Sequence, residues 1–336
     1  MATKVICIVL VRNEAWILEN FIKCATSWAD IIIIGDHNST DESAEIARKY
    51  DRVKLVPISH SAFDEGVRRK AVIDEARKVP GNRLILALDA DEMISANWAQ
   101  SPEWQLMLHA SPGTSFYFDL VEPLPGLRDA DMYGTLAGFV DDGTEYQYSN
   151  LRIHNPRLPT AQGEVVKLRD IKLLHYIFID PERMFSKHRW YKCVEYIEFG
   201  KRPWVLCIAY QDTKIKSYDA PIVEMDEEWI KGYEWLNDYR EGVERPDKDY
   251  WYDDEVLKYF DRYGVGKFSK LNIWDVDWNR RAQLLGRTGN YCDPRTPGEA
   301  WVHKFIERHR ETLKTKGGLS KIIRVFGKTG LRALGW

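Results

Sequence analysis

Cysteine is scarce and scattered in this sequence. Only five cysteines occur among 336 residues, an odd number, and no two of them form a CxxC pair. A disulfide framework and a zinc site both need thiols that come in groups, so neither is expected to organise the fold. Few and scattered cysteines are typical of proteins in a reducing compartment, so we expect a cytoplasmic protein.

Long apolar runs and a surplus of one charge are also absent. No stretch approaches the roughly 18 apolar residues of a membrane-spanning helix. The first apolar stretch, 5–11, is followed at once by Arg12, Asn13 and Glu14, which argues against a secretory signal peptide. The net charge of −3 gives no electrostatic footprint for nucleic acid over the chain as a whole.

Apolar stretches alternate with helical patterns through residues 5–110. The apolar stretches predict strands buried on both faces, and the intervening segments predict helices that cover them. Ser39-Thr40-Asp41-Glu42 fits a capping box at the start of the second helix. This alternation predicts an α/β fold with a mostly parallel sheet flanked by helices. The expected strands are 5–11, 31–34, 53–57 and 84–88, and the expected helices are 14–28, 39–50 and 65–79.

Beyond residue 96 the pattern becomes less regular. Proline, glycine and aspartate predict a long loop at 122–143, and from residue 181 the chain is aromatic and mainly helical. We expect helices at 96–109, 181–198, 225–240, 253–263 and 298–314, and strands at 115–121, 145–153 and 165–178. The predicted divisions are a first domain at 1–200, with halves at 1–95 and 96–200, a helical extension at 201–312, and a tail at 313–336.

The tail at 313–336 mixes lysine and arginine with large apolar residues and contains no acidic residue. This composition is typical of a helix that lies on an anionic membrane surface, which would make the protein peripheral to the inner face of a membrane. The alternative is a helix that docks on the protein by its apolar side. Five glycines weaken a helix in either case.

Three carboxylates, Asp89, Asp91 and Glu92, follow directly after the apolar stretch 84–88. Burying unpaired carboxylates costs several kcal/mol, so we expect this acidic cluster at the exit of the strand, where ligands bind in open α/β sheets. Two aspartates flanking one residue can hold Mn²⁺ or Mg²⁺ against a diphosphate, because these cations prefer oxygen ligands. The alternative is a solvated turn with acidic capping residues.

Three segments together resemble the family 2 glycosyltransferases of the GT-A fold. They are Val11-Arg12-Asn13-Glu14, Ile34-Gly35-Asp36-His37-Asn38-Ser39-Thr40-Asp41 and Leu88-Asp89-Ala90-Asp91-Glu92, each at the end of an expected strand. The resemblance covers residues 5–95 clearly, and it implies that the domain at 1–200 is catalytic, with a nucleotide half at 1–95 and an acceptor half at 96–200. It implies a Rossmann-like sheet and a metal-dependent, inverting transfer of sugar from a nucleotide-diphosphate sugar, with UDP as the default nucleotide. The implied acceptor is a hydroxyl of a surface glycan or of a lipid-linked glycan.

The resemblance also implies roles for particular residues. Asp36 would accept a hydrogen bond from the base, Arg69 would contact base or phosphate, and Asp91 would ligate the cation. Asp89 would bind ribose or the metal, and Glu92 would support the metal site or act as a charge at a helix start. The segment that would line the base pocket is Val11, Arg12, Asn13 and Glu14. The alternatives are an Asx turn at Asp36, a polar turn at residues 12–14, and an exposed helix face at residues 68–70, which we favour for Arg68 and Lys70.

Four further residues complete the predicted site. His175 followed by Tyr176, with Lys187 downstream, resembles a recurring feature in which the histidine completes the metal site and the lysine faces phosphate. An inverting transfer needs a carboxylate to take the proton of the acceptor, and we prefer Glu164 over Asp142 for this role. Asp141 is a third candidate. The alternatives are a hydrogen-bonded core histidine and ordinary loop acids.

Other functions stay open at this level. A sugar nucleotidyltransferase shares the carboxylate and metal chemistry, but usually has a glycine-rich loop near the first strand, and residues 9–13 contain no glycine. A non-catalytic module that binds nucleotide or sugar would show the same motifs. A glycosyltransferase acting on modified DNA would use the basic tail.

Overall fold

The computed structural model describes residues 2–59, 64–124, 126–149, 151–160, 163–210, 221–236, 250–310, 313 and 320–336. The chain forms two compact units. The first comprises Met1–Ile179 and Ser217–Val243, and the second comprises Asp180–Lys216 and Glu244–Trp336. The chain leaves the first unit after Ile179 and later returns to it. The domain boundaries expected at 200 and 312 stay a prediction.

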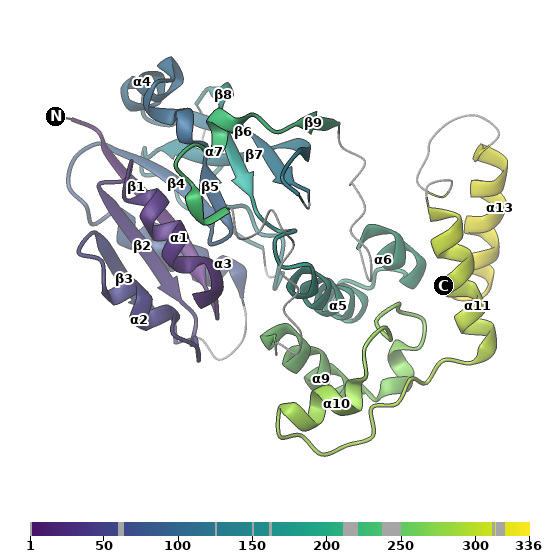
Figure 1. Ribbon diagram of the computed structural model, residues 1–336. Coiled ribbons are helices and arrows are strands. Elements are labelled where there is room, and N and C mark those ends of the chain that lie inside the picture. The colour runs from purple at the N-terminus through teal and green to yellow at the C-terminus, as the bar shows by residue number, and fades with distance from the viewer. Residues whose placement is uncertain are drawn as a thin grey trace. The chain divides into compact units, whose positions relative to one another are not determined.

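One mixed sheet forms the centre of the first unit (Figure 1). Within the described strands, β5 and β7 run against the direction of the others. The predicted α/β class, with a mostly parallel sheet flanked by helices, is confirmed. The strand order is β3 (Val53–Pro57), β2 (Ile31–Asp36), β1 (Lys4–Val11), β4 (Arg83–Asp89), β7 (Asp129–Val140), β6 (Ser115–Pro123), β8 (Val165–His175) and β5 (Glu92–Ile94), and β9 (Ile222–Glu224) pairs with β7.

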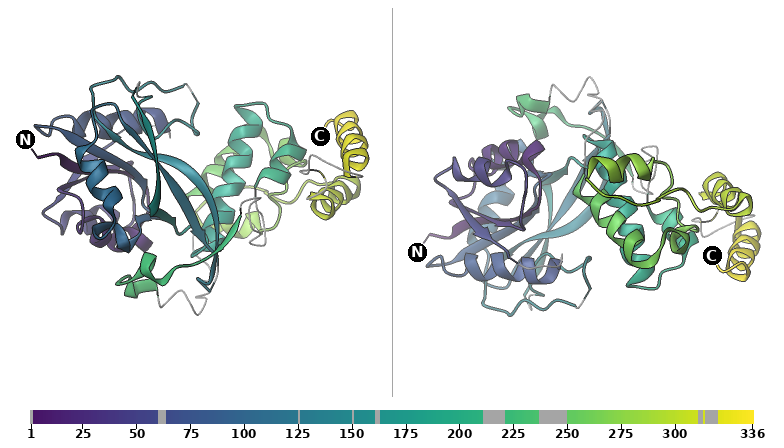
Figure 2. Two further views of the ribbon diagram at one scale, coloured as in Figure 1. Left: turned by 90° about the horizontal axis from the view of Figure 1, so that it is seen from above. Right: turned by 90° about the horizontal axis from the view of Figure 1, so that it is seen from below.

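Helices cover both faces of this sheet (Figure 2). Alternate residues of β1 point to opposite faces, as the period of a strand requires. Cys7 and Val9 join the core under α1 (Ala15–Ala25) and α2 (Ser43–Arg48). Ile6 and Ile8 join a second core under α3 (Glu65–Ala76). Burial on both faces explains why β1, β2 and β4 appear in the sequence as nearly continuous apolar runs.

The loop expected at 122–143 was a wrong prediction, because Asp129–Val140 is strand β7, paired antiparallel with β6 along its length. Its glycines and aspartates hid the strand pattern, but pairing and packing decide strand formation more than intrinsic preference does. Gly134 has no side chain to displace the ring of Tyr117: a Cβ there would lie 2.0 Å from Tyr117 Cε1. The strand expected at 145–153 was also wrong, since residues 141–149 form no strand.

Three predicted helices also differ from the structure. Helix α2 begins at Ser43 after Glu42, without a side-chain cap, so the predicted capping box at residues 39–42 was wrong. The helix expected at 96–109 is divided into η1 (Ala96–Ala99) and α4 (Pro102–His109). Ser101 caps α4, and Pro102 occupies its first turn, where a missing N–H costs nothing. The helix expected at 225–240 contains α7 (Glu227–Ile230) and η2 (Glu234–Leu236), and residues 237–240 lie outside the described part.

The second unit is helical and its core is aromatic, as predicted. Trp190, Tyr252, Phe260 and Trp278 are buried, so these rings build the core instead of an open acceptor surface. No helix in the described part of the chain has the length and apolarity needed to cross a membrane. The elements are α5 (Pro181–Ile197), α6 (Pro203–Ala209), α9 (Trp251–Tyr263), η3 (Val265–Phe268), α10 (Trp278–Leu284), α11 (Pro297–Arg308) and α13 (Ser320–Ala333).

The basic tail forms α13 despite the glycines at 327 and 330. Leu331 and Trp336 are 4% exposed and pack with residues of α6 and α11. Leu334 is 62% exposed. These contacts are those of a docked tail, which was the alternative to a membrane helix, and membrane contact stays a prediction.

Candidate active site

The motif residues meet at the carboxyl edge of the parallel strands. In the pairing of β1 with β2, Val11 lies opposite Asp36, and in the pairing of β1 with β4, Leu10 lies opposite Asp89. Parallel strands bring their carboxyl ends to the same edge, so three segments distant in sequence become neighbours. Ligands bind at this edge in open α/β sheets.

The turns after β1 and β2 are tied together by hydrogen bonds. The Asn13 N–H donates to Ser39 Oγ over 3.0 Å, and the Thr40 N–H donates to Asn13 Oδ1 over 2.7 Å. Asn13 has φ +56°, a left-handed conformation that asparagine tolerates better than most residues. Asp36 Oδ1 accepts hydrogen bonds from the N–H and the hydroxyl of Ser39. The Asp36 carboxylate therefore binds its own turn, but three residues on and not two as in the Asx turn that was the alternative. Its binding to a base stays a prediction.

Arg12 and Glu14 flank Asn13 at the edge. Glu14 is buried, its Oε2 accepts a hydrogen bond of 2.8 Å from the indole of Trp16, and its N–H donates to Ser43 Oγ. Arg12 is half-buried. The lining of a base pocket by residues 11–14 stays a prediction, supported by their position at the end of β1.

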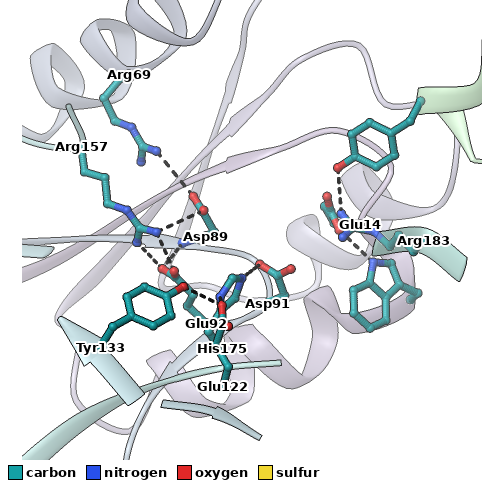
Figure 3. Close-up of polar contacts among 12 residues, drawn as sticks. Glu14, Arg69, Asp89, Asp91, Glu92, Glu122, Tyr133, Arg157, His175 and Arg183 are labelled. Carbon is teal, nitrogen blue, oxygen red and sulfur yellow. Dashed lines mark hydrogen bonds and ion pairs between the residues drawn. The ribbon is translucent and has the colours of Figure 1, made fainter. Parts of the chain in front are cut away.

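The acidic cluster is held by an arginine from a distant loop (Figure 3). Arg157 donates from Nη2 to Glu92 Oε1 over 2.6 Å and from Nη1 to Glu92 Oε2, and Nη2 also lies 3.4 Å from Asp89 Oδ2. Burial alone would lower the pKa of Arg157, but Glu92 and Asp89 raise it above its ordinary value. Glu92 is fully buried and lies on β5, so its alternative role at a helix start was wrong.

The acidic cluster is also more buried than the sequence suggested. Asp91 is 4% exposed and Glu92 is 0% exposed, whereas the side chain of Asp89 is 37% exposed. All three acids lie at or just after the end of β4, as expected, and the alternative of a solvated turn was wrong for Asp91 and Glu92. A buried carboxylate is tolerated when a cation pairs with it, and Arg157 supplies that cation for Glu92.

A second arginine reaches Asp89 from helix α3. Arg69 Nη2 lies 3.5 Å from Asp89 Oδ1, and Arg69 is 2% exposed. Its Nε and Nη1 have no hydrogen-bond partner among the described residues. Arg68 is also buried, at 4% exposed, so its assignment to an exposed helix face was wrong. Lys70, with its side chain 40% exposed and paired with Asp74, is on that face as expected.

His175 lies between two carboxylates at the end of β8. Its Nδ1 is 2.8 Å from Glu122 Oε1, and its Nε2 is 3.8 Å from Asp91 Oδ1. Tyr133 donates to the same Glu122 oxygen over 2.6 Å. Burial would lower the pKa of His175, but Asp91 and the hydrogen bond to Glu122 raise it to about 9. A histidine must be neutral to ligate a metal, so binding of a cation by His175 would release a proton.

The donor set at Asp91 and His175 suits a divalent cation. A carboxylate on Nδ1 fixes the imidazole so that Nε2 can ligate, which is the usual support of a metal-binding histidine. Adjacent ligand atoms at ~2.1 Å from an octahedral cation lie about 3.0 Å apart, so Asp91 Oδ1 and His175 Nε2, which are 3.8 Å apart, would approach each other on binding. Within the described residues, no group of three His, Cys, Asp or Glu side chains is arranged around a common metal position. The other ligands would be water or phosphate oxygens, as is common for Mg²⁺.

The structure does not bring the predicted bases to this edge. Glu164 directly precedes β8 whereas His175 ends it, and the intervening strand spans roughly 33 Å. Asp141 and Asp142 follow β7, whose last residue, Val140, pairs with Leu84 near the start of β4. Asp141 is paired with Arg77 and Arg83, and Asp142 accepts a turn hydrogen bond from Thr144. The prediction of Glu164 or Asp142 as the base is therefore corrected. Glu164 lies at the amino end of β8 and Asp142 lies near the amino end of β4, whereas the acidic cluster lies at the carboxyl end of β4.

Lys187 belongs to helix α5 of the second unit. Its Nζ lies 5.7 Å from the ring centroid of Tyr191. Its predicted contact with phosphate stays a prediction.

Sequence reasoning missed Arg157 and Glu122. Glu122 comes directly after the apolar strand residues 115–121, which is the same signal that identified the acidic cluster after 84–88. Arg157 lies in an irregular segment among several exposed residues, and no local pattern marks it. Its role follows only from the folded chain.

The comparisons with known proteins yield weak structural likeness. No protein-family model and no curated protein matches the chain. The glucosyl-3-phosphoglycerate synthase of Mycobacterium tuberculosis, crystallised with Mn²⁺, UDP-glucose and phosphoglyceric acid, is 16% identical with a TM-score of 0.27, over 36% of this chain and 44% of that one. The chain thus matches less than half of that synthase.

Two other solved structures show similar values. The CTP:phosphocholine cytidylyltransferase of Streptococcus pneumoniae is 14% identical with a TM-score of 0.25, over 41% of this chain and 68% of that one. The mannose-1-phosphate geranyltransferase of Thermus thermophilus is 12% identical with a TM-score of 0.27, over 60% of this chain and 65% of that one. Likeness at this level identifies neither a family nor an activity.

Proposed function

We propose that this protein is a metal-dependent glycosyltransferase that takes sugar from a nucleotide-diphosphate sugar. The observation that carries the proposal is the meeting of Asp36, Asp89 and the Asp91–His175 pair at one carboxyl edge of the sheet. A nucleotide-diphosphate sugar needs a base contact, a ribose contact and a charge on its diphosphate. The edge offers residues of suitable chemistry for each.

The arginines and the carboxylates divide these tasks in the proposal. Asp36 and residues 11–14 receive the base, and Asp89, the most exposed of the three acids, receives ribose. Arg69 lies beside Asp89, and its Nε and Nη1 have no hydrogen-bond partner among the described residues. In the proposal these donors bind a phosphate oxygen of the donor substrate. Arg157 holds Glu92 and so fixes the turn that carries Asp89 and Asp91.

Asp91 and His175 would hold Mn²⁺ or Mg²⁺, with Glu122 fixing the imidazole through Nδ1. A cation in this place neutralises the diphosphate that leaves when the sugar is transferred. The buried His175–Glu122 pair keeps one orientation of the ring before any ligand arrives. UDP is the proposed nucleotide and a hydroxyl of a glycan or lipid-linked glycan is the proposed acceptor, with inversion at the anomeric carbon.

The shift in melting temperature on binding of metal and nucleotide tests this proposal. We expect Mn²⁺ with UDP to raise the melting temperature of the full chain, since a ligand that binds only the folded state stabilises it. Asp91→Asn is expected to lose the metal-dependent part of the shift. Asp51→Asn, at an exposed position, is the matched control and is expected to keep it. An equal shift in Asp91→Asn and in the control would refute the metal assignment.

A donor screen separates an enzyme from a module that only binds. Slow hydrolysis of a UDP-, GDP- or dTDP-sugar with Mn²⁺ or Mg²⁺, in the absence of acceptor, is expected of a glycosyltransferase. A binding module would show the thermal shift without hydrolysis. A nucleotidyltransferase would instead form nucleotide sugar from nucleoside triphosphate and sugar phosphate.

A further inference from the structure

A cavity of about 440 Å³ lies within the second unit and is lined by residues of that unit alone. One wall is the face of α11 that carries Ala300, His303, Lys304 and Glu307, which are spaced three and four residues apart. The volume falls within the roughly 300 to 1,000 Å³ typical of small-molecule sites. None of the residues proposed for the donor site contributes to this cavity.

Arg310 lines this cavity and is 6% exposed. It makes no hydrogen bond and no ion pair with any residue that the structure describes. Its side-chain nitrogens are not among the described polar atoms that are both sealed from solvent and without a partner, so they keep some exposure. A nearly buried cation without a counter-ion is costly, because it gives up hydration and gains no partner.

The other charged groups of the cavity do not neutralise Arg310. Asp275 is bound to Arg189 Nη1 over 2.8 Å. Arg295 is held by Asp293, with its Nη2 2.6 Å from Oδ2, and its Nη1 lies 3.0 Å from His303 Nδ1.

His303 carries no charge at neutral pH, because burial lowers its pKa to about 4. Lys304 and Glu307 are exposed members of the α11 face and carry opposite charges. Among the described residues that line the cavity, the buried charge left without a counter-ion is therefore the guanidinium of Arg310.

We propose that this cavity binds a small molecule that carries an oxyanion group, phosphate or carboxylate, against Arg310. A guanidinium presents paired donors that match either group. Trp274, Ala300 and Ile306 supply apolar wall for the remainder of the ligand.

Thermal unfolding of the full chain tests the proposal with inorganic phosphate, glycerol 3-phosphate and acetate as probes. Each is titrated against sodium chloride of equal ionic strength, with EDTA present. We expect a saturable rise in melting temperature of at least about 2 °C at tenfold excess over the midpoint concentration. The rise is expected to disappear in Arg310→Met and to persist in Arg308→Met, an exposed arginine at the last position of α11. A rise with both phosphates but not with acetate identifies phosphate, and the reverse identifies a carboxylate.

Two results would overturn the proposal. One is an equal rise in Arg310→Met and Arg308→Met, and the other is no saturable rise with any probe in the parent protein. Should Arg310→Met fail to fold, Arg310→Lys and Lys304→Met are titrated by calorimetry with the best probe. Both are expected to weaken binding at least threefold, and unchanged binding in both would equally overturn it.

Discussion

The guanidinium of Arg157 spans both carboxylate oxygens of Glu92, a residue that is 65 positions away in the sequence and fully buried. The same guanidinium touches Asp89, and Glu92 Oε2 accepts the N–H of Asp89 over 2.9 Å. The turn that carries the proposed donor-binding acids is thus fixed by protein contacts before any ligand binds.

Removal of Arg157 should destabilise the first unit strongly. Arg157→Met leaves Glu92 as a buried carboxylate without a cation, and we expect a loss of about 3–5 kcal/mol in the free energy of unfolding. Urea unfolding measures this loss. Arg169→Met, at an exposed position, is the control and should change stability by less than about 0.5 kcal/mol. The double variant Glu92→Leu with Arg157→Met should recover part of the loss, and full additivity of the two single effects would contradict the pairing.

Glu122 should matter for metal affinity although it would not touch the metal. Its carboxylate holds Nδ1 of His175, so Glu122→Gln weakens the orientation and basicity of the imidazole. We expect Mn²⁺ to bind about 10- to 100-fold more weakly, as measured by calorimetry in the presence of UDP. Glu145→Gln, at an exposed position, should leave the affinity unchanged. An unaltered affinity in Glu122→Gln would remove His175 from the proposed ligands.

Glu164→Gln and Asp142→Asn should keep donor hydrolysis and transfer near the parent rates. Both residues lie at the amino ends of their neighbouring strands, whereas Asp89 and His175 lie at carboxyl ends. We expect kcat within about threefold of the parent for each, since a missing general base typically costs roughly 100-fold or more. A larger loss in either variant would show that the residue acts at the reacting centre after all.

Gly134 should not accept a side chain. A Cβ at this position would lie 2.0 Å from Tyr117 Cε1 on the paired strand β6, so Gly134→Val should lower the free energy of unfolding by about 1–3 kcal/mol. Gly266→Val is the control for backbone position, because a Cβ there meets nothing within 4 Å. Combining Gly134→Val with Tyr117→Ala should cost less than the sum of the two single changes. Simple additivity would mean that β7 does not pack against Tyr117.

His303 should make the second unit sensitive to acid. Burial lowers its pKa from 6.5 to about 4, so the unfolded chain binds a proton at a pH where the folded chain does not. Its stability contribution is therefore complete above pH ~6.5 and is lost as pH falls toward 4, by about 2 kcal/mol between pH 7.5 and pH 5. Urea unfolding at these two pH values should show that loss in the parent and in the exposed-site control His109→Gln. In His303→Gln the loss should be smaller by about that amount, and an equal loss would refute the assignment.

Local patterns predicted the first four parallel strands and their helices because each strand is buried on both faces and carries its own apolar signal. Strand β7 carried no such signal: Asp129, Asp131, Gly134 and Gly138 interrupt it, and pairing with β6, β4 and β9 makes it a strand. The capping box failed for a related reason. The Ser39 hydroxyl donates to Asp36 and accepts from the Asn13 N–H, so it is not available to cap a helix.

By itself the sequence determined that Asp36, Asp89 and Asp91 would gather at one edge, because parallel strands align their carboxyl ends. Only the tertiary structure decided what neutralises those acids. Arg157 and Glu122 arrive from segments whose local sequence does not fix their direction, and burial of charge is tolerable only where such partners meet. Tertiary structure also separates Glu164 from the site. Pairing within the sheet sets the length of β8, which places Glu164 and His175 at opposite ends of the strand, and the residues around Glu164 do not encode that distance.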